Sequence, residues 1–77
     1  MKVKLHLRGD EKLEVMIPDG DKFKPQIVHN LTFDVSTDGQ DAATFAGPPA
    51  GLLHVCNVAE AVAAALQVGA DYVLTPA

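Results

Sequence analysis

The residues best suited to chemistry stand close together near the middle of the second half of the chain. Cys56 directly precedes Asn57, which with Glu60 three residues later matches a helix capping box. A thiol at a helix N-terminus meets the positive end of the helix dipole, which favours the reactive thiolate. Thiol loops that bind phosphate place glycines or an arginine between the cysteine and the helix, and the stretch CNVAEAV contains neither. The pattern therefore favours a structural Cys56 and leaves a catalytic Cys56 as the alternative.

His54 lies two residues before Cys56, so both side chains share a face if this segment is extended. A His-x-Cys pair can supply two zinc ligands, whereas a structural zinc site needs four. The other donors are His6, His29 and scattered carboxylates, and there is no second cysteine. A Cys56–His54 nucleophile pair is also disfavoured, because residues i and i+2 of a strand stand several ångströms apart. We therefore predict no metal site and no cofactor.

The first elements that position these residues are strands with alternating hydrophobicity. Residues 2–8 and 12–17 each place apolar side chains on one face and charged ones on the other, which is typical of half-buried strands. Between them, residues 8–11 contain Gly9 and Asp10, which are turn formers. The pattern predicts a first β-hairpin, followed by an irregular segment over residues 18–25.

Residues 27–36 alternate again and precede the turn-forming sequence STDGQ. A two-residue loop would pair Val35 with Ala42, whereas a three-residue loop ending at Gly39 would pair Leu31 with Phe45. We favour the longer loop, because it keeps the aromatic rings on the buried side. The two prolines and two glycines of residues 46–51 then end this second hairpin.

A helix is predicted over residues 58–68, with Asn57 and Glu60 at its start and Gly69 as its C-terminal cap. Its broad apolar stripe should lie on the sheet. The opposite side is mostly alanine, which permits the close approach of another helix, and consists of Ala59, Ala63 and Ala64. A short final strand is predicted over residues 71–75.

These elements define an α+β fold, with a mainly antiparallel sheet and one helix on one face, in the order β-β-β-β-α-β. Residues 1–77 form a single domain, in which 1–46 hold the two hairpins and 57–75 hold the helix and the closing strand. The predicted buried face comprises Val3, Leu5, Leu7, Leu13, Val15, Ile17, Leu31, Phe33, Phe45, Val62 and Leu66.

Composition and charge narrow the function classes. With 77 residues the chain can bury one core, and its 48% hydrophobic and 21% charged residues are typical of a folded domain. All six Lys and Arg residues lie in the first 24 positions with five acids among them, and the remainder has no Lys or Arg. This layout argues against nucleic-acid binding, which requires clustered cations. A single cysteine, a charged N-terminus and no long apolar run predict a soluble cytoplasmic protein without a membrane partner.

We therefore predict a small non-catalytic protein–protein interaction module, such as an inhibitor or accessory protein of the phage type. It would dock onto another protein or form a homodimer, using an exposed sheet edge, the first strand or the alanine face. The predicted binding residues are Lys2, Lys4, His6, Arg8, Ala59, Ala63 and Ala64. The alternative is a small thiol or ligand-binding enzyme centred on Cys56, with His54 as its neighbour.

Overall fold

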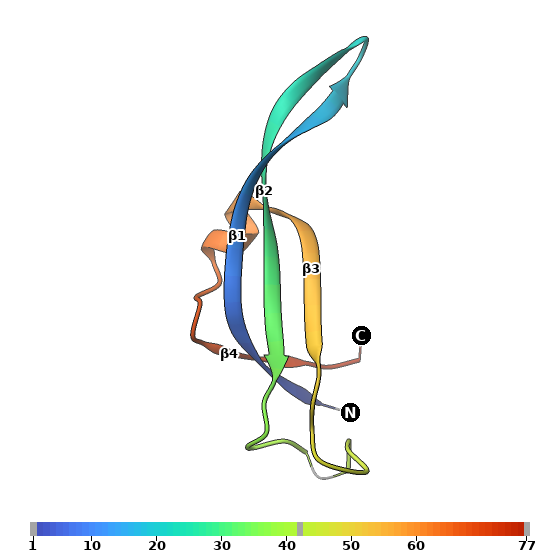
Figure 1. Ribbon diagram of the computed structural model, residues 1–77, viewed down its shortest axis with the longest axis vertical. Helices are drawn as coiled ribbons and strands as arrows, with labels where there is room; N and C mark the ends of the chain where they lie inside the picture. The colour runs from blue at the N-terminus through green and yellow to red at the C-terminus, as the bar shows by residue number, and fades with distance from the viewer. Residues whose placement is uncertain (1, 42, 77) are drawn as a thin grey trace.

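The computed structural model describes residues 2–41 and 43–76, most of them in one antiparallel sheet. Its strands are β1 (Val3–Asp19), β2 (Lys22–Val35), β3 (Leu52–Ala59) and β4 (Asp71–Leu74), and helix α1 (Glu60–Ala64) joins β3 to β4. Hydrogen bonding gives the strand order β3-β2-β1-β4. Figure 1 shows β3, β2 and β1 side by side, with β4 running across the lower end of β1. The predicted antiparallel sheet with one helix is confirmed, but the chain order among the described residues is β-β-β-α-β, with one strand fewer than predicted.

β1 and β2 form a single long hairpin, so the predicted turn at residues 8–11 is wrong. The backbone continues through this region with Arg8 as an extra residue: Leu7 opposes Phe33 and Gly9 opposes Thr32. The hairpin turns instead at Gly20 and Asp21, within the segment predicted to be irregular. Gly20 has a φ of 63°, which suits a two-residue hairpin loop with glycine at its first position.

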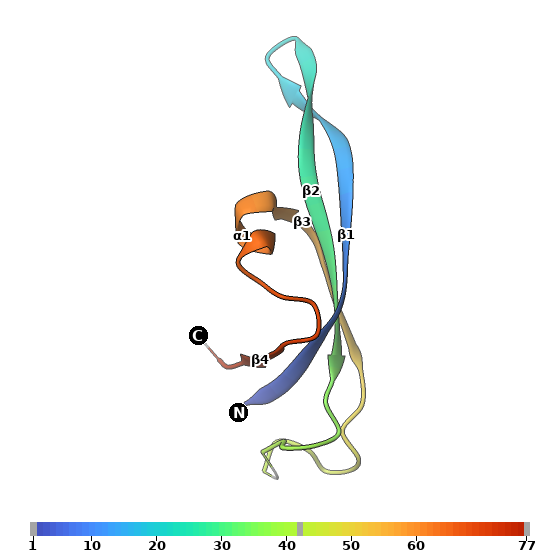
Figure 2. The ribbon, with the colours of Figure 1, turned by 90° about the vertical axis from the view of Figure 1, so that its left-hand side faces the viewer.

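The β-bulge at Arg8 reverses the faces of β1, because it adds one residue to a strand whose side chains alternate. Helix α1 covers one face of the sheet, which we call the helix-side face (Figure 2). Before the bulge, Leu5 and Leu7 lie on this face, in the buried cluster against which Leu66 and Tyr72 pack. After it, the residues that share this face begin with Asp10, which opposes Leu31. The opposite, open face then receives three residues that were predicted to join the core, Leu13, Val15 and Ile17. That part of the predicted core is wrong.

The second predicted hairpin does not form. β2 pairs with β3, and Phe33 opposes Leu53 instead of a residue near 43. Residues 36–41 and 43–51 belong to no helix or strand. The Gln40 side chain ties this part of the chain to β1: its Nε2 donates to Lys4 O at 2.7 Å and its Oε1 accepts from Lys4 N at 2.8 Å. The alternative pairing of Val35 with Ala42 falls on a residue outside the described ones.

β3 extends through the predicted helix start, so α1 is only five residues long. Asn57 does not cap it: Asn57 has a φ of 58°, and its N–H donates to Asn30 Oδ1 at 3.2 Å. This is a second β-bulge, because three steps along β3, from Val55 to Val58, match two steps along β2. Pairing of Val58 and Ala59 with β2 outweighs the local preference for a helix. Gly69 is not the helix cap either, because α1 ends at Ala64 and its C-cap is Ala65. Gly69 has a φ of 95° in the segment that leads to β4, and the predicted final strand is confirmed.

The core lies on the helix-side face, where α1 and the returning chain cover the sheet (Figure 2). Phe33 meets Tyr72 edge to face, with 6.3 Å between ring centroids. Of the predicted core, Val3 and Leu66 are partly buried against this cluster, Phe45 is half-buried in the loop, and Val62 is 55% exposed. The cluster of buried residues consists of Leu5, Leu7, Leu31 and Phe33.

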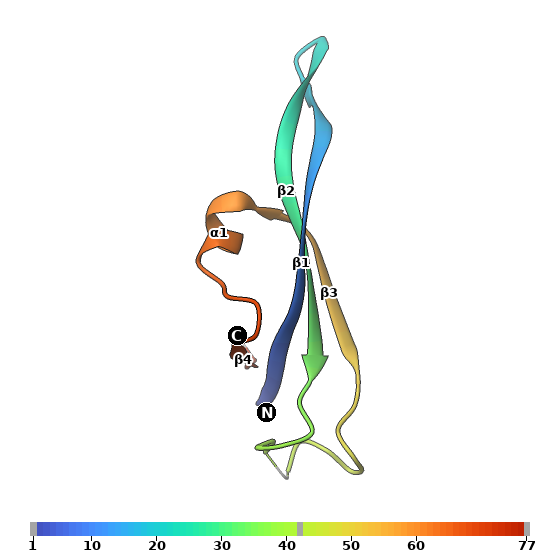
Figure 3. The same ribbon diagram turned by 60° about the vertical axis from the view of Figure 1, so that its left-hand side comes forward.

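Residues 12–27 project beyond this core as a two-stranded extension, which we call the hairpin arm (Figures 1 and 3). β4 pairs with β1 only over Val3–His6, and β3 pairs with β2 only over Val28–Asp34. The molecule therefore measures 52 × 23 × 17 Å, with a radius of gyration of 15.7 Å. A compact chain of this length would have a radius of gyration of about 11 Å. Among the described residues, no helix has the length and apolar character needed to cross a membrane.

Candidate functional site

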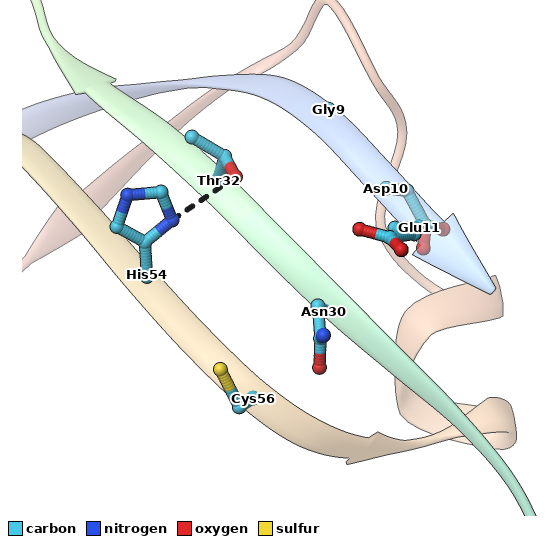
Figure 4. A pocket seen from close by; sticks show the side chains of 7 residues that line it. All are labelled: Gly9, Asp10, Glu11, Asn30, Thr32, His54 and Cys56. Atoms are coloured by element: carbon cyan, nitrogen blue, oxygen red, sulfur yellow. Dashed lines mark hydrogen bonds between the residues drawn. The ribbon is translucent and has the colours of Figure 1, made fainter. Parts of the chain in front are cut away.

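A shallow hollow on the open face is lined by several polar residues, including His54 and Cys56 (Figure 4). The two bulges flank it, one at Arg8 in β1 and the other after Val55 in β3. β-Bulges re-aim side chains and often lie beside functional sites. The lining residues come from three neighbouring strands and are Gly9, Asp10, Glu11, Asn30, Thr32, His54 and Cys56. Among them, Asp10 directs its carboxylate to His29 on the helix-side face.

His54 and Cys56 share the open face of β3, as the sequence predicts for an extended segment (Figure 4). Thr32 lies opposite His54 on β2, and its Oγ1 is 3.2 Å from His54 Nδ1. Cys56 is an exposed free thiol within β3, and four positions separate it from the first residue of α1. The helix-terminus environment on which the catalytic interpretation of Cys56 depends is therefore not present at this residue.

The donors around the hollow do not converge on one point within a single chain. Across residues 2–41 and 43–76, there is no group of three or more His, Cys, Asp and Glu side chains placed to hold a metal ion. His54 and Cys56 alone form half of a four-ligand set. The hollow can thus bind a metal only with ligands from elsewhere.

A second polar pair, which the sequence analysis did not identify, lies beside the core. His29 is 8% exposed, and its Nδ1 is 2.6 Å from Asp10 Oδ1. Its Nε2 is buried and has no hydrogen-bond partner among the described residues. The pair forms because the bulge at Arg8 turns Asp10 to the helix-side face. A period-2 pattern without a bulge places Asp10 on the other face, so the sequence pattern offers no signal for this pair.

The predicted basic surface of the first strand is largely paired with acids. Asp71, at the start of β4, lies 2.9 Å from His6 Nδ1 and 3.5 Å from Lys4 Nζ. Arg8 donates to Asp34 Oδ1 at 3.1 Å. The tertiary structure therefore converts a basic strand into a nearly neutral strip, in which Lys2 is exposed at one end.

The predicted alanine face is not a surface of the helix. Ala63 is 3% exposed and packs in the core, whereas Ala59 belongs to β3 and Ala64 is exposed. Because α1 begins at Glu60 and is short, its inward side is set by the path from β3 and not by the stripe of a longer helix. These three alanines cannot act together as a docking face.

No protein-family model matches this chain, and neither does any curated protein or solved structure with which it was compared.

The contact between β1 and β4 makes stability depend on pH. The hydrogen bond with His6, helped by the Lys4 ammonium, lowers the pKa of Asp71 below its ordinary value of 3.8. A carboxylate with a lowered pKa stabilises the fold above its unfolded pKa, and this contribution disappears as the pH falls through the folded pKa. We expect Asp71→Asn to lower the urea midpoint slightly at pH 7, because Asp71 is solvent-exposed and its ion pairs are screened.

The two proteins should converge in stability as the pH falls below about 4. Urea titrations of both proteins from pH 7 to pH 2.5 measure this, with Asp38→Asn as a control in the exposed loop. A deficit of Asp71→Asn that persists undiminished at the lowest pH would contradict the assignment.

Proposed function

We propose that this protein is a small protein–protein interaction module that binds its partner with the hairpin arm. The observation that carries the proposal is the length of the arm beyond the core. Two strands alone are at best marginally stable in water, so an arm of this length gains stability when another surface covers it. This function agrees with the class predicted from the composition.

The arm offers apolar contacts on both faces. Met16 and Phe23 are 59% and 67% exposed on the helix-side face. Leu13, Val15 and Ile17 are half-buried on the other face. Exposed aromatic and Met side chains are enriched in protein interfaces, where they fill pockets of the partner. The lysines and acids along the same strands would form the polar rim of such an interface.

The test compares the double variant Met16→Ser/Phe23→Ser with Val73→Ser, which removes an equally exposed apolar side chain outside the arm. Each protein is used as bait in native lysate, and its molar mass in solution is measured by light scattering. We expect wild type and Val73→Ser to hold the same partner, and the arm variant to lose this binding. Circular dichroism should show all three folded.

Equal binding by the arm variant and wild type would show that the arm is not the binding element. A wild-type protein that stays monomeric and captures nothing would contradict the proposal as a whole.

A further inference from the structure

A second surface, the outer edge of β3, points to a specific assembly. β3 ends the sheet on one side, and its sequence LLHVCNVA has no lysine, arginine or carboxylate. Leu52, Leu53 and Val55 are 56%, 36% and 38% exposed. Natural edge strands are commonly protected by charges, prolines or bulges, and here the only such device is the bulge after Val55. Two copies of this edge can therefore approach each other without electrostatic repulsion.

The backbone pattern identifies which residues face outward. Val35 N donates to Gly51 O at 3.0 Å, so residues 51, 53 and 55 direct their backbone groups toward β2. Hydrogen bonding alternates along an antiparallel strand, so residues 52, 54 and 56 direct theirs to the free edge. A second β3 that pairs antiparallel about a two-fold axis at Val55 would exchange hydrogen bonds between His54 of one copy and Cys56 of the other.

We propose that two copies pair in this way and bind one Zn²⁺ through the His54 and Cys56 side chains of both. All four side chains lie on the open face, because 54 and 56 have the same parity on β3 and directly opposed residues share a face. Two residues along the strand span about 7 Å and opposed hydrogen-bonded residues about 5.5 Å, so each Cα lies about 4 Å from the centre. All four side chains can therefore reach one zinc ion near this centre, with bonds of about 2.3 Å to sulfur and about 2.0 Å to nitrogen. Two cysteines and two histidines are a common ligand set for structural zinc.

The hydrogen bond that would orient His54 toward the metal is already formed in one chain. In the tautomer in which His54 Nδ1 carries the proton, it donates to Thr32 Oγ1 at 3.2 Å, and Nε2 presents its lone pair. Histidines that bind zinc usually donate their other ring proton to such a partner. The bulge after Val55 interrupts the regular edge at residues 56 and 57, which leaves only a short ladder between the copies. The metal would supply the stability that the short ladder lacks.

The proposed register also excludes a disulfide between the two Cys56 residues. With the axis at Val55, the two Cys56 residues lie diagonally, with Cα atoms about 9 Å apart, which is too far for a disulfide. The site rests on β3 and not on the hairpin arm, so its test is independent of the proposed interaction through the arm.

The experiment measures solution mass and metal content of the full chain with one equivalent of Zn²⁺ and with EDTA. We expect a dimer of the 8.1 kDa chain with one zinc per two chains, and a monomer in EDTA. Co²⁺ should give the thiolate charge-transfer bands of a tetrahedral site at the same stoichiometry. His54→Ala and Cys56→Ser should abolish zinc-linked dimerisation, and the control His6→Ala should retain it. Thr32→Val should weaken zinc affinity by about 10–100-fold.

Three outcomes would overturn the zinc site: a monomer in the presence of zinc, one zinc bound per monomer, or a dimer that is equally stable in EDTA and in His54→Ala. The Val55→Lys variant separates pairing from ligation, because it places two ammonium groups at the axis and leaves both ligands in place. It should abolish the zinc-linked dimer, and a dimer that survives it contradicts this register. The arm variant Met16→Ser/Phe23→Ser should dimerise with zinc as wild type does, whatever it does to other partners.

Discussion

Leu7→Ala is expected to lower the free energy of unfolding by about 2–5 kcal/mol. Leu7 is 1% exposed and is the most completely buried large side chain among the described residues. The substitution removes apolar contacts with the other core residues and leaves a cavity beneath the chain that returns from α1. The Leu7 backbone would still pair with that chain, since its O accepts from Gly69 N at 2.8 Å.

A domain of this length is stabilised by roughly 4–12 kcal/mol in total, so Leu7→Ala should bring the chain close to unfolding. Urea denaturation followed by circular dichroism measures the loss. Leu74→Ala, which truncates a side chain that is 47% exposed, is the matched control and should cost much less. Equal losses for the two variants would show that the core does not lie where Leu7 places it.

Asp10→Ala is expected to lower the free energy of unfolding by about 1–3 kcal/mol, because it leaves the buried His29 without its hydrogen-bond partner. His29 Nε2 already lacks a partner among the described residues, so the ring would then be buried with both nitrogens unsatisfied. Glu11→Ala removes the neighbouring exposed carboxylate and serves as the control. Urea denaturation of both variants gives the comparison.

A double variant makes this prediction sharper. Asp10→Ala/His29→Leu removes both polar partners and replaces the ring with an apolar side chain, so it should recover much of the stability that Asp10→Ala loses. Additive losses in the two single variants and the double variant would mean that the pair is not coupled. A strong coupling energy would confirm that the bulge at Arg8 places Asp10 on the helix-side face.

The alternation of apolar and polar residues alone was sufficient to predict much of the sheet. The alternation of residues 3–7 and 27–35 correctly predicted two strands and the burial of Leu5, Leu7, Leu31 and Phe33. These predictions succeeded because one face of an antiparallel strand must be apolar to be buried, and the period of 2 is visible in the residues themselves. The closing strand was also predicted, whereas β3 was not: the shared face of His54 and Cys56 was predicted only on the condition that their segment is extended.

The sequence pattern could not show where this periodicity shifts. Gly9 is compatible with a turn and with a bulge, and the choice depends on whether β2 lies alongside to pair with the continuing strand. The difference of one residue at Arg8 moves Leu13, Val15 and Ile17 away from the core and brings Asp10 to His29.

The predictions of a long helix and of a basic surface on the first strand were wrong for the same reason. In both cases, residues distant in the sequence competed with the local preference. Asn57 and Glu60 satisfy a capping box locally, yet β2 offers backbone hydrogen bonds to residues 58 and 59. The charges of Lys4 and His6 are evident in the sequence, but their neutralisation by Asp71 requires β4 to lie beside β1.

The sequence by itself determined the class of fold and the strand faces near the core. Only the tertiary structure decided that Cys56 lies in an edge strand, that Asp10 pairs with His29 and that residues 12–27 project as an arm. Side-chain periodicity is a local property of the chain, whereas bulges, edges and ion pairs depend on which distant strand lies next to it.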